Sequence, residues 1–253
     1  MRETKVVGIV AMVLLAAATA GTAQGEDNGV AVGVTGDFFS SYVWRGQHLT
    51  DGWVFQPGAS VSYAGVTAGV WGNLDLEDVN GEEGEFIEYD WYLDYSGQLT
   101  DVVGFSLGAI YYYFPSVGET TELYWGFNFD VPASPSVTVY HDIDAAEGTY
   151  VSAGVGHTFD DIFEIGADSP VALELGATIG WGDSSYNEFY WGPDDGEFND
   201  LVLSAALPFE LGGFSVTPSA HYVFLVGSDI QDADTYDEDN DIFYGGIGFA
   251  KEF

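Results

Sequence analysis

The stretch FIEYDWYLDYSGQL at residues 86–99 separates apolar from charged side chains at every second position. The odd positions from Ile87 to Leu99 are mostly large and apolar, whereas the even positions include Glu88, Asp90 and Asp94. Successive side chains of a β-strand point to opposite faces, so this period of two predicts a strand with one apolar and one charged face.

The same alternation recurs along the chain and predicts a total of twelve strands, each about ten residues long or slightly longer. Besides 86–99, the expected strands are 30–45, 53–63, 66–77, 102–113, 120–131, 136–143, 149–159, 171–182, 200–209, 214–226 and 242–253. Odd-numbered connections are mostly long and acidic and even-numbered ones mostly tight turns, with 160–170 as the exception. Strands of this length joined in this way are typical of an outer-membrane β-barrel.

A soluble β-sandwich or a lipocalin-like barrel would also alternate, but with its apolar face inside. Tyr and Trp near the strand ends favour the inverted arrangement, because aromatic residues gather at membrane interfaces. The residues that suggest this belt are Trp44, Trp53, Tyr111, Tyr113 and Trp181. The sequence therefore predicts an all-β fold, a transmembrane antiparallel up-and-down barrel of about 12 strands.

The charge balance limits the partners that the protein can have. The chain carries 4 Lys+Arg against 41 Asp+Glu, for a formal net charge of −37, which excludes electrostatic binding of nucleic acid or of an anionic lipid surface. Hydrophobic residues make up 47% and aromatic residues 16%, which excludes a disordered acidic chain. The absence of Cys argues against a small scaffold held by disulfides.

Both ends of the sequence indicate export to the outer membrane of a Gram-negative-type envelope. Residues 1–23 combine two cations, an apolar run at 6–20 and small residues, which predicts a secretory signal peptide followed by a barrel at 24–253. A retained membrane helix is the alternative, but the apolar run is shorter than the ~20 residues that span a bilayer. At the other end, Ile247, Phe249 and Phe253 share one face of a last strand, as in the signal that the barrel assembly machinery recognises.

The stretch SSYVWRG at 40–46 supplies the most specific motif. Ser40, Tyr42, Trp44, Arg45 and Gly46, with the signal peptide and the terminal Phe, resemble the TorF-type family of porins. That resemblance implies a β-barrel and a transport role, and it says little about the solute.

Arg45 stands out because only Lys251 shares its positive charge beyond the first five residues. If residues 30–45 form one strand, Asp37 and Arg45 face the lumen while Tyr42 and Trp44 face lipid. The lumen-facing acids expected across the barrel are Asp37, Asp75, Glu88, Asp90, Asp94, Glu122, Asp130, Asp142 and Glu174. We hypothesise that Arg45 clamps some of them near the outer mouth; a solvated arginine at the rim is the alternative.

These features predict passive, weakly cation-preferring diffusion of small cationic or neutral solutes through the outer membrane. Inward Trp71, Tyr112, Tyr124 and Tyr140 would narrow the lumen, so a non-conducting structural or adhesive barrel with acidic extracellular loops is the alternative. No catalytic residue, cofactor or metal is expected. No catalytic motif surrounds the four His residues, and QDADTYDEDND at 231–241 departs from the EF-hand template.

Overall fold

The computed structural model describes residues 29–81, 83–165, 169–233, 235–236 and 240–253. The predicted signal peptide at 1–23 lies outside these residues. None of the helices in the described ranges is long and apolar enough to cross a membrane.

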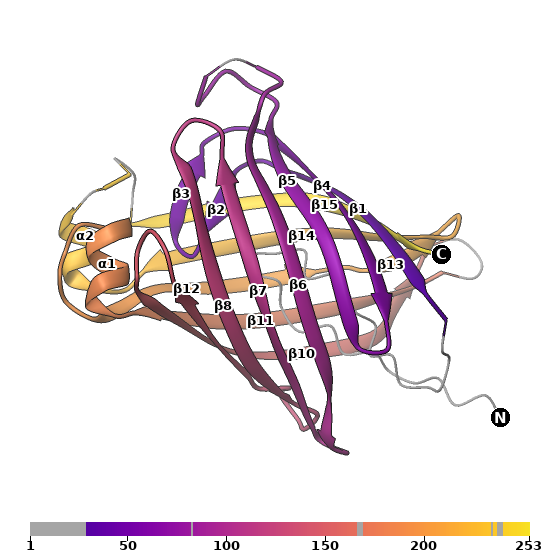
Figure 1. The fold of residues 1–253 in the computed structure, drawn as a ribbon. Helices are drawn as coiled ribbons and strands as arrows, with labels where there is room; N and C mark the ends of the chain where they lie inside the picture. The colour runs from indigo at the N-terminus through magenta and orange to yellow at the C-terminus, as the bar shows by residue number, and fades with distance from the viewer. Residues whose placement is uncertain (1–28, 82, 166–168, 234, 237–239) are drawn as a thin grey trace.

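Twelve antiparallel strands form a closed up-and-down barrel, as the alternation predicts (Figure 1). They are β1 (Ala31–Phe39), β4 (Val54–Tyr63), β5 (Val66–Asp75), β6 (Phe86–Thr100), β7 (Val103–Phe114), β8 (Gly118–Phe129), β9 (Ser136–Asp142), β10 (Thr149–Glu164), β11 (Pro170–Gly182), β12 (Glu197–Ala206), β14 (Phe214–Leu225) and β15 (Asp241–Glu252). Each strand pairs with the next in this order, and β15 returns to β1. The short β13 (Phe209–Leu211) follows Pro208 and pairs with β14 beside the end of β12.

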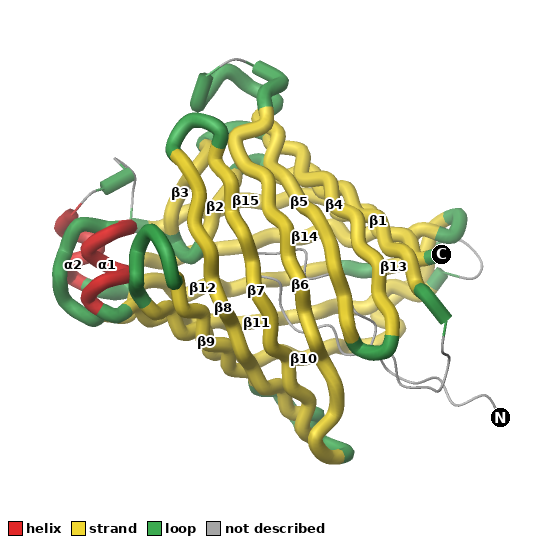
Figure 2. The backbone as a smooth tube through the Cα atoms, viewed as in Figure 1, coloured by secondary structure: helices red, strands yellow, loops and turns green. Residues whose placement is uncertain are grey.

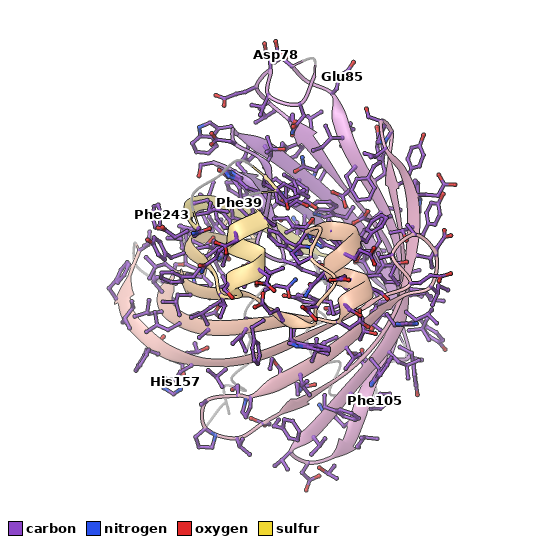
Figure 3. All side chains as sticks on the ribbon, turned by 90° about the vertical axis from the view of Figure 1, so that its left-hand side faces the viewer. Phe39, Asp78, Glu85, Phe105, His157 and Phe243 are labelled. Atoms are coloured by element: carbon purple, nitrogen blue, oxygen red, sulfur yellow. The ribbon has the colours of Figure 1, made fainter. Side chains whose placement is uncertain are left out.

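The two faces of the wall differ as expected. On β6, Trp91, Leu93 and Tyr95 are 46%, 55% and 47% exposed on the outside, while Glu88 and Asp90 are each 2% exposed on the inside. Figure 3 shows Phe105, His157 and Phe243 on the outer surface, and Phe39 within. The apolar surface of this protein is therefore the outside of the barrel.

The exceptional connection at 160–170 is explained by a longer hairpin. β10 continues to Glu164, and its pairing with β11 shifts register between Phe159 and Phe163. The irregularity breaks the alternation of two, which is why the sequence pattern appeared to stop at residue 159.

The prediction of one strand at 30–45 is wrong. The wall strand ends at Phe39, and the chain then forms a separate hairpin of β2 (Tyr42–Trp44) and β3 (Gln47–Thr50). Arg45 (φ 50°) and Gly46 (φ 85°) form its two-residue turn, because a tight hairpin with this twist needs positive φ at both positions.

This hairpin lies inside the barrel. Tyr42 and Trp44 are 2% and 6% exposed, so the prediction that they face lipid is also wrong. They pack instead against inward rings of the wall, Tyr42 against Trp71 and Trp44 against Tyr112. Two short helices, α1 (Ser184–Tyr190) and α2 (Ser228–Ala233), lie in long connections at one end of the barrel, here called the loop end (Figures 1 and 2).

Candidate functional site

The tip of the β2–β3 hairpin places Arg45 against a carboxylate of the wall. Arg45 Nη1 and Nη2 donate to the two oxygens of Glu122 on β8, at 2.7 and 2.8 Å. The two side chains are 5% and 1% exposed, so water is nearly absent from the pair. Tyr112 on β7 also donates to Glu122, at 2.8 Å. A planar guanidinium matched to both carboxylate oxygens is the strongest common form of ion pair.

Aromatic rings enclose the same guanidinium. Its Cζ lies 4.5, 4.3 and 4.5 Å from the ring centroids of Trp44, Tyr140 and Tyr150, and 5.8 Å from that of Tyr186 on α1. We call these four rings and Glu122 the Arg45 cage. Cations are attracted to ring faces at such distances, and the attraction grows when water is excluded.

The cage keeps Arg45 charged. Burial alone lowers the pKa of Arg45, but Glu122, followed by the Tyr186 and Tyr112 hydroxyls, raises this pKa well above its ordinary value. Burial together with the nearby Glu88 and Asp90 likewise raises the pKa of Tyr42, which stays a hydrogen-bond donor.

Further contacts tie both arms of the hairpin to the barrel. Tyr42 on β2 donates to Glu88 at 2.7 Å, and Thr50 at the end of β3 donates to Asp75 at 3.0 Å. Gln47, next to the tip, accepts from Tyr236 in the connection that carries α2. The hairpin is thus held at its base and at its tip by groups from separate parts of the chain.

The structure brings five of the nine predicted lumen acids into the buried interior: Asp75, Glu88, Asp90, Glu122 and Asp142. Within the described residues, Glu122 is the one acid that forms an ion pair with Arg45, so the arginine pairs with one carboxylate rather than with several. Asp142 instead accepts from Thr120 and from two backbone N–H groups of the following loop.

Three other predicted acids, Asp37, Asp94 and Glu174, are half-buried inside the wall away from the cage. Asp94 accepts from Tyr124 at 2.6 Å. The ninth predicted acid, Asp130, follows the end of β8 and is exposed in the turn. At the C-terminal strand, Phe249 and Phe253 are exposed as predicted for an outward face, at 38% and 69%.

Sequence reasoning missed Tyr150, Tyr186 and Asp200. Tyr150 closes the cage and donates to the fully buried Asp200 at 2.8 Å. Its inward position could have been read from the alternation with outward Val151 and Ala153. Tyr186 had no such signal, because a helix of seven residues within a long acidic connection is too short to show a period.

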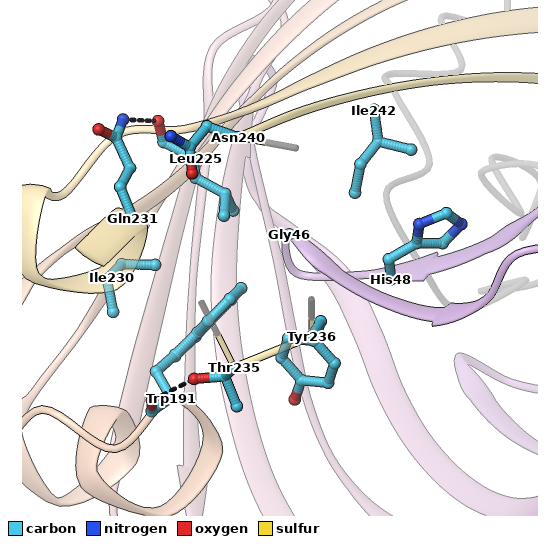
Figure 4. Close-up of a pocket in the computed structure, with 10 residues that line it drawn as sticks. All are labelled: Gly46, His48, Trp191, Leu225, Ile230, Gln231, Thr235, Tyr236, Asn240 and Ile242. Carbon is cyan, nitrogen blue, oxygen red and sulfur yellow. Dashed lines mark hydrogen bonds between the residues drawn. The ribbon is translucent and has the colours of Figure 1, made fainter. Parts of the chain in front are cut away.

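A small pocket lies beside the hairpin tip, between Gly46 and the segment that carries α2 (Figure 4). It is lined by Gly46, His48, Trp191, Leu225, Ile230, Gln231, Thr235, Tyr236, Asn240 and Ile242. The buried Trp191 Nε1 has no hydrogen-bond acceptor within the described part of the chain. A water molecule or a small polar group would suit this nitrogen.

Comparison with known proteins identifies the architecture. No protein-family model matches the chain, and no curated protein matches its sequence. Among solved structures, a KdgM porin is similar with a TM-score of 0.51 and 9% identity, over 88% of this chain and 99% of that chain. A KdgM porin in complex with disordered oligogalacturonate gives 0.50 and 10%, over the same shares. LpxR from Salmonella typhimurium gives 0.50 and 7%, over 87% of this chain and 99% of that one. At these identities the likeness shows that the chain shares the barrel fold of these proteins.

Proposed function

We propose that this protein is a porin-like channel of the outer membrane that passes small solutes with a weak preference for cations. The outward band of Trp, Tyr and aliphatic side chains suits lipid, and the barrel fold is shared with the KdgM porin. The likeness of residues 40–46 to TorF-type porins supports the same role.

The proposed cation preference follows from the excess of acidic side chains inside the barrel. Eight of the predicted acids face inward, five buried and three half-buried, against the single inward cation Arg45 among the described residues. An interior of one sign concentrates ions of the opposite sign, as rings of Asp or Glu do in cation channels. Screening over about 8 Å at physiological salt keeps such selectivity modest in a water-filled passage.

A non-conducting structural barrel is the second candidate, and the hairpin favours it. Tyr42, Trp44 and Arg45 are at most 6% exposed, and α1 packs on Trp44 through Tyr190. A channel of this shape would therefore conduct weakly unless the hairpin moves.

Planar-bilayer recording under a potassium chloride gradient separates the two functions. The wild type should show small steps with a reversal potential biased toward cations. A variant with residues 42–50 replaced by Gly-Gly should show larger steps, and it can close because Phe39 already pairs with Val54. Silence of both proteins, with both barrels folded, would reject the channel and leave the structural role.

The origin of the preference is tested by neutralising the half-buried acids. The triple variant Asp37→Asn, Asp94→Asn, Glu174→Gln should move the reversal potential toward zero. Asp130→Asn, at an exposed turn, is the matched control and should leave it unchanged. Equal effects of the two would show that the interior acids do not set the preference.

We assign no catalytic activity. LpxR, which is not named as a porin, has the same fold at a similar TM-score, so the fold by itself does not distinguish a channel from other barrels of this kind.

A further inference from the structure

The Arg45 cage has the geometry of a guanidinium-binding site. Two parallel N–H···O bonds at 2.7 and 2.8 Å require a planar fork, which an ammonium group lacks. Three ring centroids within 4.5 Å of Cζ cover the group, and Glu122 is 1% exposed. Shape, charge and desolvation therefore all select the same chemical group.

The cage is built mainly by the wall of the barrel. Glu122, Tyr140 and Tyr150 come from β8, β9 and β10, which are neighbouring strands, and Tyr140 pairs directly with Tyr150. Two of its polar groups have a further partner: Tyr112 donates to Glu122, and Tyr150 donates to Asp200. The wall part of the site is thus held by strands and hydrogen bonds that do not depend on Arg45.

The occupant, in contrast, is the tip of a hairpin that lies inside the barrel and is not part of its wall. Arg45 is the residue at φ 50° in the β2–β3 turn, and β2 and β3 pair only with each other within the described residues. Arg45 therefore occupies the wall site in the way that a covalently tethered ligand occupies a binding site.

We propose that Glu122, Tyr140, Tyr150 and Tyr186 form a binding site for solutes that carry a guanidinium group, with Arg45 as its built-in occupant. The proposal rests on the channel function above and names the class of cation that the interior recognises. A free guanidinium solute enters the cage only when the hairpin tip leaves it, so the tethered Arg45 outcompetes millimolar solute in the wild type.

The test uses the variant Arg45→Ala, in which the cage is empty. The probe is methylguanidinium chloride, and the control salt is methylammonium chloride at the same millimolar concentration. Thermal unfolding of the detergent-solubilised barrel is followed by its shift on a gel. Methylguanidinium should raise the melting temperature of Arg45→Ala by at least about 2 °C more than methylammonium does, because a ligand stabilises the folded state that binds it. Wild type and Lys251→Ala, in which Arg45 fills the cage, should respond equally to both salts.

The double variant Arg45→Ala, Glu122→Gln should lose the difference between the salts. Equal responses of Arg45→Ala to both salts, or an undiminished difference in the double variant, would overturn the proposal. If Arg45→Ala does not fold unaided, the folded fraction after refolding is measured instead. Recovery with methylguanidinium but not with methylammonium supports the site, and failure to recover overturns it.

The thermal and refolding measurements do not depend on ion conduction, so they test the guanidinium site separately from the channel. A positive thermal shift with a silent bilayer would keep the guanidinium site and reject the channel. Current without a thermal shift would do the opposite.

Discussion

Removing the negative charge of Glu122 should be among the most damaging single changes to this barrel. Glu122→Gln keeps the shape of the side chain but leaves Arg45, 5% exposed, without its counter-charge. Loss of one partner from a buried, hydrogen-bonded pair costs about 3–5 kcal/mol, because the remaining charge is neither solvated nor paired. We expect the free energy of unfolding to fall by this amount.

The assay is reversible urea unfolding in lipid vesicles, followed by tryptophan fluorescence, with the slope of the transition compared between variants. The matched control is Glu119→Gln, the same change at an exposed position of the same strand, which should stay within about 0.5 kcal/mol of wild type.

A double-mutant cycle isolates the pair. Arg45→Met with Glu122→Gln removes both charges, so the double variant should be more stable than Glu122→Gln alone, since no unpaired ion remains buried. A cost of Glu122→Gln below about 1 kcal/mol, the range of exposed ion pairs, would refute the reasoning that this bond is desolvated and holds the hairpin.

Three further predictions concern the turn, the outer face and the last strand. Gly46→Ala should destabilise the barrel by about 1–3 kcal/mol in the same urea assay, because Gly46 has φ 85° and a new Cβ would lie 2.9 Å from Asp200 Cβ. Gly81→Ala, in open space, should not. Leu107→Arg, on the outer face of β7, should make insertion into vesicles less favourable by about 2–4 kcal/mol, and an unchanged value would place this face away from lipid. Phe253→Ala should lower the yield of folded barrel in cell membranes relative to Glu252→Ala, and equal yields would remove Phe253 from the assembly signal.

The strands could be predicted because the two faces of the wall differ in character. Along β6, the outward Trp91, Leu93 and Tyr95 are exposed and apolar, while the inward Glu88 and Asp90 are buried acids. This contrast is local and recurs along most of the strands, so the number of wall strands could be predicted from the sequence.

The hairpin could not be found in that way, because inside the barrel its two faces both meet protein. Tyr42 and Trp44 continue the alternation of β1, because they occupy even positions like its outward residues. The alternation alone does not reveal whether an aromatic side chain faces outward or packs against another ring. The stronger signal was Arg45-Gly46 between two β-favouring runs, a two-residue turn in which Gly accepts positive φ. From the sequence, the candidate partners of Arg45 could be limited to the inward acids. Which of them pairs with Arg45 could not be predicted, because the position of Glu122 depends on the tertiary arrangement of β8.

The pairing of β1 with β15 has a consequence for how the protein is made. Ser40 and Gly245 are in contact although 205 residues separate them in sequence. The sheet therefore has two unpaired edge strands until β15 pairs with β1 and closes the barrel. An unpaired strand border is a template on which other chains can add. Contacts between residues so far apart in sequence also form slowly. A chain that stops before Asp241 would therefore remain an open sheet that sticks to its neighbours, rather than a slightly weaker barrel.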